Sequence, residues 1–140
     1  MKQIPVIYWS GTGNTQIMAE AVAETINDAG AEALLKNVAE ISADEVAKYE
    51  ALALGCPAMG AEVLEEYEFE PFFMELEKQL SGKKVALFGS YGWGGTYMQD
   101  WEERVKTAGA KLVADGVLAL GAPDAEALTK LAEAAKLLAE

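Results

Sequence analysis

The fold of this 140-residue chain is decided by the stretch Tyr8-Trp9-Ser10-Gly11-Thr12-Gly13-Asn14-Thr15. An apolar run with the length of a buried strand, Ile4 to Trp9, leads into it, and an amphipathic helical pattern follows it. The small polar and glycyl residues from Ser10 to Thr15 supply hydroxyls, an amide and backbone N–H groups at the start of that helix. Because a helix N-terminus attracts anions, the stretch indicates a phosphate-binding loop that contains no charged side chain.

Other interpretations of this stretch are weaker. An ordinary polar turn between a strand and a helix remains possible, but it would need fewer consecutive donors. A Walker A loop ends in Gly-Lys-Ser/Thr, whereas this one ends in Gly13-Asn14-Thr15. The dinucleotide pattern G-x-G-x-x-G starts correctly at Gly11 but has Gln16 at its third glycine. The loop therefore favours a phosphate ester of a small cofactor over a nucleoside triphosphate or NAD.

Length and composition predict one globular domain, residues 1–140, in which 51% hydrophobic residues supply the core. No apolar stretch approaches the roughly 20 residues of a membrane helix, and the lone Cys56 cannot form an internal disulfide. We expect a cytoplasmic monomer. The formal charge of −12 disfavours nucleic acid and anionic membranes as partners. The absence of histidine disfavours hydrolytic catalysis and most transition-metal sites, and we expect no metal.

The rest of the chain alternates predicted strands and helices. Capping residues and apolar spacing predict helices over 16–30, 42–49, 71–80, 96–109 and from 124 onward, and strands over 32–38, 51–54, 85–88 and, interrupted at 115–116, 112–120. We expect Ile17 and Leu128 on the buried faces of the first and last helices. Short linkers and right-handed crossovers then predict an α/β fold, a doubly wound, five-stranded parallel sheet with helices on both faces.

Three loops leave the carboxyl ends of strands with unusual chemistry: the first loop, residues 9–15, the second loop, 55–62, and the third loop, 89–95. In such sheets ligands bind at the carboxyl ends of the strands, so we expect the loops to converge. The third loop presents Tyr91 and Trp93 among glycines, either as walls for a flat ligand or as rings packed onto the core. Met59 in the second loop suits an aromatic face. A planar ligand between Met59 and Trp93, with its phosphate in the first loop, would account for all three loops.

In this order and spacing, the three loops resemble those of a flavodoxin of the short-chain, clostridial type. The resemblance extends over the whole chain through Val63-Leu64-Glu65, Glu70-Pro71-Phe72 and Gly82-Lys83-Lys84-Val85. It implies the strand order 2-1-3-4-5 and non-covalently bound FMN. It also implies an electron-transfer protein rather than an enzyme, a low-potential carrier that cycles mainly between the neutral semiquinone and the hydroquinone and shuttles single electrons between redox enzymes.

The same resemblance implies a set of cofactor contacts. Residues 10–15 would hold the phosphate, Met59 and Trp93 would flank the isoalloxazine, and Glu62 would accept a hydrogen bond from the ring N3–H. Backbone groups near Gly89, Tyr91 and Gly92 would meet the pyrimidine edge. The full set of expected FMN-binding residues is Trp9, Ser10, Gly11, Thr12, Gly13, Asn14, Thr15, Pro57, Ala58, Met59, Gly60, Ala61, Glu62, Gly89, Ser90, Tyr91, Gly92, Trp93 and Gly94.

An acidic segment lies next to the expected ring and consists of Glu62, Glu65, Glu66, Glu68 and Glu70. It is either a solvated loop or a docking surface for redox enzymes with basic surfaces, such as ferredoxin-type reductases or oxidoreductases. Cys56, which follows the third strand, is expected to be a small buried residue and no redox thiol.

Other classes that share this architecture fit less well. A phosphoacceptor receiver domain needs an acidic pair after the first strand and an Asp after the third, where this chain has Trp9-Ser10 and Gly55-Cys56. A low-molecular-weight phosphatase needs an Arg that closes a Cys loop, and no Arg closes the loop after Cys56. An FMN-dependent quinone reductase shares the phosphate loop but is disfavoured by the short chain.

Gly60 generates the first testable prediction. As the first central residue of a turn over Met59-Gly60-Ala61-Glu62, it can adopt the positive φ that lets its carbonyl accept from the flavin N5–H after one-electron reduction. Alanine would have to adopt the same conformation at a cost of roughly 1 kcal/mol or more. Gly60→Ala should therefore lower the potential of the first electron in a redox titration. An unchanged semiquinone yield would remove this role.

Overall fold

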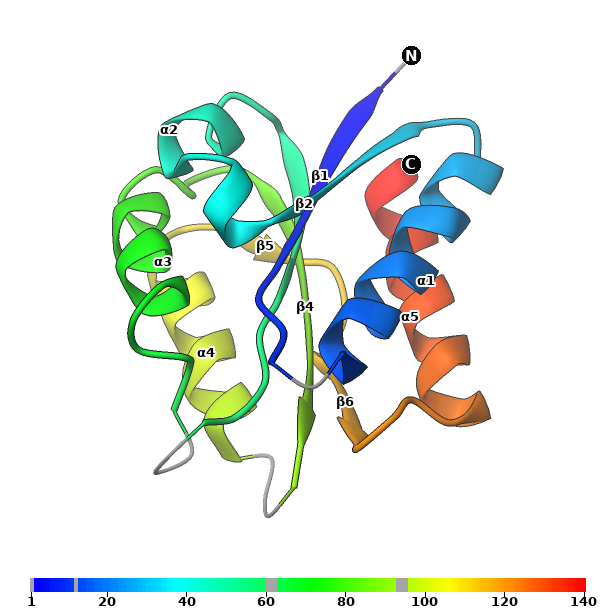
Figure 1. The fold of residues 1–140 in the computed structure, drawn as a ribbon. Coiled ribbons are helices and arrows are strands. Elements are labelled where there is room, and N and C mark those ends of the chain that lie inside the picture. The colour runs from blue at the N-terminus through cyan, green and yellow to red at the C-terminus, as the bar shows by residue number, and fades with distance from the viewer. Residues whose placement is uncertain (1, 12, 60–62, 93–95) are drawn as a thin grey trace.

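One parallel sheet separates two layers of helices in the computed structural model, which describes residues 2–11, 13–59, 63–92 and 96–140 (Figure 1). The strand order is β2-β1-β3-β4-β5, and β6 also pairs with β4. Every one of these pairings is parallel, which confirms the predicted fold class and strand order. The strands are β1 (Gln3–Tyr8), β2 (Glu32–Asn37), β3 (Ala51–Gly55), β4 (Lys84–Tyr91), β5 (Lys111–Leu112) and β6 (Val117–Leu120).

The helices begin and end close to the predicted positions. Their bounds are α1 (Asn14–Asp28), the 3₁₀ helix η1 (Val38–Glu40), α2 (Ala43–Val46), α3 (Phe69–Glu77), α4 (Thr96–Thr107) and α5 (Ala125–Ala139). Ser42 and Asp124 cap α2 and α5 as predicted, each accepting a backbone N–H of the first turn. Gly30, with φ of 92°, ends α1 in the left-handed conformation that terminates many helices.

The two faces of the sheet bury side chains of different size. Small residues such as Ala51, Ala53 and Ala86 face α1 and α5. Their neighbours Leu52 and Leu54 face α3 and α4, where a layer of aromatic rings completes the core. Adjacent residues of a strand point to opposite faces, so this alternation lets α1 and α5 approach the sheet closely. Figure 1 shows these two helices together on one side and α2, α3 and α4 on the other.

Some boundaries and buried faces differ from the prediction. Helix α1 begins at Asn14 rather than Gln16, and α3 begins at Phe69, two residues before Pro71. Ile17 and Leu128 are 47% and 41% exposed, so their placement on buried faces was wrong. The buried stripes of α1 and α5 pass through Met18 and Leu131 instead. One residue of a helix turns about 100° from the next, so Ile17 lies beside the buried stripe rather than on it. Thr96, at which the predicted helix 96–109 begins, is the first helical residue of α4 and not its cap.

The last predicted strand is interrupted because two separate segments pair with β4. β5 pairs at Lys84 and Val85, and β6 pairs from Phe88 to Tyr91. Between them, the Gly116 N–H donates to Glu102 Oε2 at 2.6 Å. A Cβ at Gly116 would lie 2.4 Å from the sulfur of Met98, so this close approach to α4 requires glycine. The interruption keeps the carboxyl end of β6 level with that of β4.

No helix within the described residues is both long enough and apolar enough to cross a membrane. Cys56 follows β3 and is fully buried, as expected, with its sulfur 3.3 Å from the backbone N–H of Glu65. Burial raises the pKa of the Cys56 thiol far above its usual value. A thiol kept protonated in this way is a poor nucleophile.

The buried thiol predicts a loss of stability in alkali. Above about pH 8.5 the Cys56 thiol ionises in the unfolded chain while the folded protein retains the proton, so stability falls as pH rises. The free energy of unfolding should then decrease by up to about 1.4 kcal/mol per pH unit more in the wild type than in Cys56→Ala. Urea unfolding at pH 7, 8, 9 and 10 measures both slopes. Parallel slopes for the two proteins would contradict an unionised buried thiol.

Candidate cofactor site

The first loop opens the N-terminus of α1 toward the carboxyl edge of the sheet. Its N-cap, Gly13, has φ of 95° and carries no side chain that could accept a hydrogen bond from the first helical turn. The Gly13 N–H itself donates to Ser10 Oγ at 3.0 Å, which closes the loop. The positive end of the helix dipole and the N–H groups of the first turn therefore remain available to an anion.

Two contacts tie the first loop to its neighbours. The hydroxyls of Thr15 and Ser90 lie 3.1 Å apart, and both residues are buried. The backbone N–H of Trp9 donates to the Gly55 carbonyl at 3.0 Å, which extends the pairing of β1 with β3 by one residue. The indole of Trp9 lies across Gly11, where a Cβ would come within 3.1 Å of the ring. These contacts connect all three loops, and a side chain at position 11 would press against the indole of Trp9.

The second loop runs between β3 and a short bridge. The Ala58 N–H donates to the Ser90 carbonyl at 3.0 Å. Met59 and Val63 then exchange backbone hydrogen bonds of 2.8 and 3.1 Å in an antiparallel bridge. Gly60, Ala61 and Glu62 lie outside the described residues, so the turn predicted for them is not described. The bridge brings together the two ends of the segment that contains Gly60.

The third loop begins inside β4. Gly89 packs so closely under Cys56 and Tyr97 that an added Cβ would lie 2.1 Å from the Cys56 carbonyl oxygen. Burial raises the pKa of the Tyr97 hydroxyl, which donates to that carbonyl at 2.9 Å. Tyr91 is half-buried, packs against the α3 and α4 side of the core, and also faces the site. Trp93 and Gly94, like Thr12 in the first loop, lie outside the described residues.

The loops surround a hollow of about 440 Å³ at the carboxyl ends of β1, β3, β4 and β6. Nine of the predicted residues line it, and they are Trp9, Gly11, Asn14, Pro57, Ala58, Met59, Ser90, Tyr91 and Gly92. Four predicted residues lie close by but outside its lining, and they are Ser10, Gly13, Thr15 and Gly89. The expected convergence of the three loops is therefore observed.

The lining also contains Leu120 and Gly121, which the sequence analysis missed. Leu120 pairs with Tyr91 in the sheet, and the Gly121 N–H donates to the Tyr91 carbonyl at 3.1 Å. The available signal was positional, because any strand parallel to β4 places its carboxyl end at the same edge. At 67% exposure, Leu120 adds an apolar residue to the open rim of the hollow.

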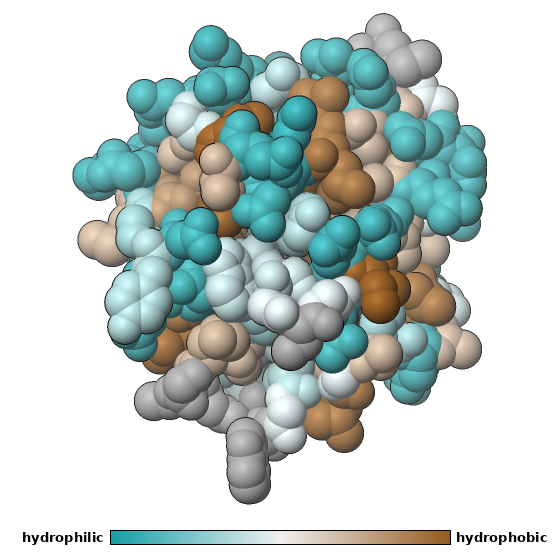
Figure 2. Space-filling model, in the orientation of Figure 1, coloured by the Kyte–Doolittle hydropathy of each residue, from teal (hydrophilic) through white to brown (hydrophobic). Residues whose placement is uncertain are grey.

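The hollow suits an elongated ligand with an anionic tail and a flat apolar body. Its lining combines Asn14, Gly11 and the start of α1 with the side chains of Met59 and Tyr91. Its described lining contains no charged residue, and its volume is in the usual range for small cofactors. Figure 2 shows pale and brown surface beside the grey residues of this lower edge. The residues present therefore fit FMN.

Only part of the acidic segment is exposed, so neither a solvated loop nor a docking surface describes all five of its glutamates. Glu65 is 4% exposed, and its carboxylate accepts backbone N–H groups instead of facing solvent. Glu70 pairs with Arg104 of α4 at 2.7 Å. Glu66 and Glu68 are exposed, and Glu68 Oε1 accepts the indole N–H of Trp9 at 3.1 Å. Glu62 lies outside the described residues.

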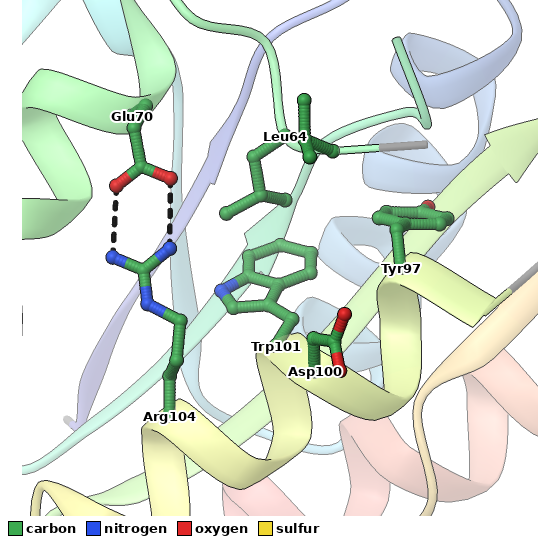
Figure 3. Close-up of a pocket in the computed structure, with 7 residues that line it drawn as sticks. Leu64, Glu70, Tyr97, Asp100, Trp101 and Arg104 are labelled. Carbon is green, nitrogen blue, oxygen red and sulfur yellow. Dashed lines mark hydrogen bonds and ion pairs between the residues drawn. The ribbon is translucent and has the colours of Figure 1, made fainter. Parts of the chain in front are cut away.

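A second, smaller hollow of about 80 Å³ lies between α3 and α4 (Figure 3). Two parallel hydrogen bonds join Glu70 to the Arg104 guanidinium beside it, and Glu77 shares the same guanidinium. The hydrogen bonds that Arg104 donates to Glu70, together with those to Glu77, raise the pKa of Arg104 despite its partial burial. Trp101 Nε1, buried next to these groups, has no hydrogen-bond partner in the part of the chain that the structure describes. This hollow is too small for a cofactor. The ion pair between Glu70 of α3 and Arg104 of α4 beside it holds the two helices together.

Comparison with known proteins agrees with this geometry. The family model described as flavodoxin matches residues 6–134. A flavodoxin of Clostridium beijerinckii is 50% identical over 120 residues, which are 85% of this chain and 87% of that protein. A flavodoxin of Megasphaera elsdenii is 41% identical over 133 residues, 94% of this chain and 97% of that protein.

The fold of this chain also agrees with solved flavodoxin structures. The solution structure of two-electron reduced Megasphaera elsdenii flavodoxin superposes with a TM-score of 0.87 at 42% identity, covering 95% of this chain and 98% of that one. A flavodoxin from the domain Archaea gives 0.85 at 26% identity, covering 98% and 96%. The chain thus belongs to the flavodoxin family of FMN-binding electron-transfer proteins, which are not enzymes.

Proposed function

We propose that this flavodoxin is a low-potential one-electron carrier between redox enzymes, in which non-covalently bound FMN supplies the redox chemistry by cycling mainly between its neutral semiquinone and its hydroquinone. The observation that supports this most is the hollow of about 440 Å³, whose described lining has no charged residue and combines apolar side chains with the start of α1. We further propose that residues 1–140 form one domain.

The residues divide into two groups by the part of FMN that they would hold. The phosphate would be held by backbone N–H groups and side chains of the first loop, Ser10 to Thr15, without a cation. The ring would lie between Met59 and Trp93, with Glu62 accepting at N3–H, the Gly60 carbonyl close to N5, and backbone groups of Gly89, Tyr91 and Gly92 at the pyrimidine edge. The N-terminus of α1, the Met59–Val63 bridge and the position of Tyr91 in the lining support this division.

The proposed low potential follows from the electrostatics of the chain. A formal charge of −12 makes an added negative charge on the cofactor unfavourable. The described lining has no cation, and Arg104, which lies outside that lining, is paired with Glu70 and Glu77. Apolar neighbours such as Met59 and Tyr91 also withhold solvent from a charged ring.

Stepwise reduction of the FMN-loaded protein, followed by absorption, tests this function. A one-electron carrier should pass through a blue neutral radical before the colour is lost. Riboflavin, which lacks the phosphate, should bind the apoprotein at least about 100-fold more weakly than FMN, because the first loop then has no anion. A direct two-electron conversion would favour the quinone reductase alternative, and equal affinities for FMN and riboflavin would contradict the phosphate loop.

We also propose that redox partners with basic surfaces dock at the carboxyl edge of the sheet. Glu66 and Glu68 are exposed there, around Tyr67, which is 89% exposed, and Met59, which is 39% exposed. Exposed apolar groups with an acidic rim suit a short-lived complex that is guided by charge. The strongly negative chain would repel nucleic acid and anionic lipid. We propose that the protein acts as a monomer in the cytoplasm, where its single buried cysteine stays reduced.

The docking proposal predicts that electron transfer to a basic haem protein such as cytochrome c slows as salt rises. The second-order rate constant should fall by about tenfold or more between roughly 0.02 and 0.5 M ionic strength. At low salt Glu66→Gln should slow the reaction, whereas Asp28→Asn, at the opposite end of α1, should not. Stopped-flow measurements give both rate constants. A salt-independent rate, or equal effects of the two substitutions, would contradict docking at this edge.

A further inference from the structure

We propose that Glu65 is a positioning residue for the FMN site, and that its buried carboxylate holds the Met59 and Trp9 sides of the hollow in place. This inference rests on the proposed function, since it concerns how the chain prepares the same site. Glu65 lies outside the lining of the hollow and would act only through the residues that it fixes.

The Glu65 carboxylate replaces a missing helix cap. The N-cap of α3, Glu68, makes no capping hydrogen bond with its own side chain. Instead, the backbone N–H of Tyr67 donates to Glu65 Oε2 at 2.8 Å, and those of Glu68 and Phe69 donate to Oε1 at 2.7 and 2.8 Å. Three such bonds to one buried carboxylate offset the cost of its burial and give the segment a single conformation.

The backbone of Glu65 is fixed as firmly as its side chain. Its N–H donates to the sulfur of Cys56 at 3.3 Å, and its carbonyl accepts the N–H of Glu70 at 2.8 Å. Glu70 is in turn held by Arg104. Glu65 is thus attached to the end of β3, to the start of α3 and, through Glu70, to α4.

One consequence reaches the Met59 side of the hollow. Val63, two residues before Glu65, exchanges both backbone hydrogen bonds with Met59. Leu64, which lies between Val63 and Glu65 in the chain, is 5% exposed and packs into the core on the α3 and α4 side. The path from the Glu65 carboxylate to Met59 therefore contains only hydrogen-bonded or buried residues. Loosening Glu65 should loosen the bridge that brackets Gly60.

A second consequence reaches the Trp9 side. The carboxylate accepts the backbone N–H of Glu68, and Glu68 Oε1 accepts the indole N–H of Trp9 at 3.1 Å. The indole in turn lies over Gly11 of the first loop. One buried carboxylate is therefore connected to both the phosphate end and the ring end of the proposed cofactor site.

Glu65→Gln tests the proposal, with Glu66→Gln as its matched control. The glutamine side chain has one acceptor oxygen and turns an NH₂ toward a backbone N–H, so at least one of the three bonds is lost. Glu66 is adjacent and exposed, so Glu66→Gln removes the same charge and none of these bonds. The dissociation constant of FMN from the apoprotein should rise about tenfold in Glu65→Gln and little in Glu66→Gln.

The potential of the first electron separates positioning from charge. Glu65→Gln and Glu66→Gln each remove one negative charge, and this loss by itself should leave the first-electron potential unchanged or make it less negative. A looser Met59–Val63 bridge should instead make the first-electron potential of Glu65→Gln more negative than that of the wild type. Glu65→Asp keeps the charge but shortens the side chain, so it should shift the potential in the same direction by a smaller amount, and it also serves if Glu65→Gln fails to fold.

The outcomes distinguish this inference from the proposed function. Glu65→Gln is compared with Glu66→Gln, and Glu65→Asp is compared with the wild type. If each Glu65 variant has a lower melting temperature than its reference but the same FMN affinity and the same two potentials, Glu65 is only structural and the inference is wrong. If the wild type itself shows no one-electron step, the proposed function fails, whatever the variants do. Hydrogen exchange at the amides of residues 67–69 in the apoprotein should be faster in both Glu65 variants.

Discussion

The parallel pairing of β4 with β3 on one side and β6 on the other is the constraint on which the rest of the structure depends. It sets Leu120 opposite Tyr91, so that β4 and β6 end at one level, and it sets Gly55, the last residue of β3, opposite Phe88. The loops then continue the ladder, because Trp9, Ala58 and Gly121 each donate a backbone hydrogen bond to the strand beside them. The loops therefore leave the sheet from fixed starting points, and the hollow between them has a defined shape.

Close packing beneath this edge explains where glycine is needed. Gly55 lies against the ring of Phe88, and Gly89 lies against Cys56 and Tyr97, at distances that leave no room for a Cβ. The absence of a side chain at these two positions is required by the packing of the sheet. At Gly11 the approach is less close, because a Cβ there would lie 3.1 Å from the indole of Trp9. Glycine therefore occurs near the site for two separate physical reasons. Close packing favours it at Gly55 and Gly89, and a positive φ favours it at Gly13.

Two lysines at the amino edge of the sheet bind the C-terminal ends of helices. At the amino edge, Lys2 donates to the carbonyls of Leu138 and Glu140 near the end of α5, and Lys83 donates to those of Ala47 and Tyr49 after α2. Cations at helix C-termini interact favourably with the helix dipole. The carboxyl edge has the N-terminus of α1 and exposed carboxylates near it. A cofactor bound at that edge as proposed would be held by dipoles and hydrogen-bond donors and would remain in a negative field.

The sequence by itself determined the elements, the first loop and the convergence of three loops, because apolar periodicity and runs of small polar residues are local properties that survive folding. The three loops that contain nine of the lining residues were found in this way, whereas the full set of expected contacts and the strand order came from resemblance to a family. The tertiary structure alone decided that Leu120 and Gly121 join the site, and that Ile17 faces solvent. It alone buried Glu65, since three backbone N–H groups must converge on its carboxylate before burial becomes favourable. Glu65 and Glu66 are the same residue type and adjacent in the sequence. Only the folded chain directs the Glu65 side chain toward backbone N–H groups and leaves Glu66 exposed to solvent.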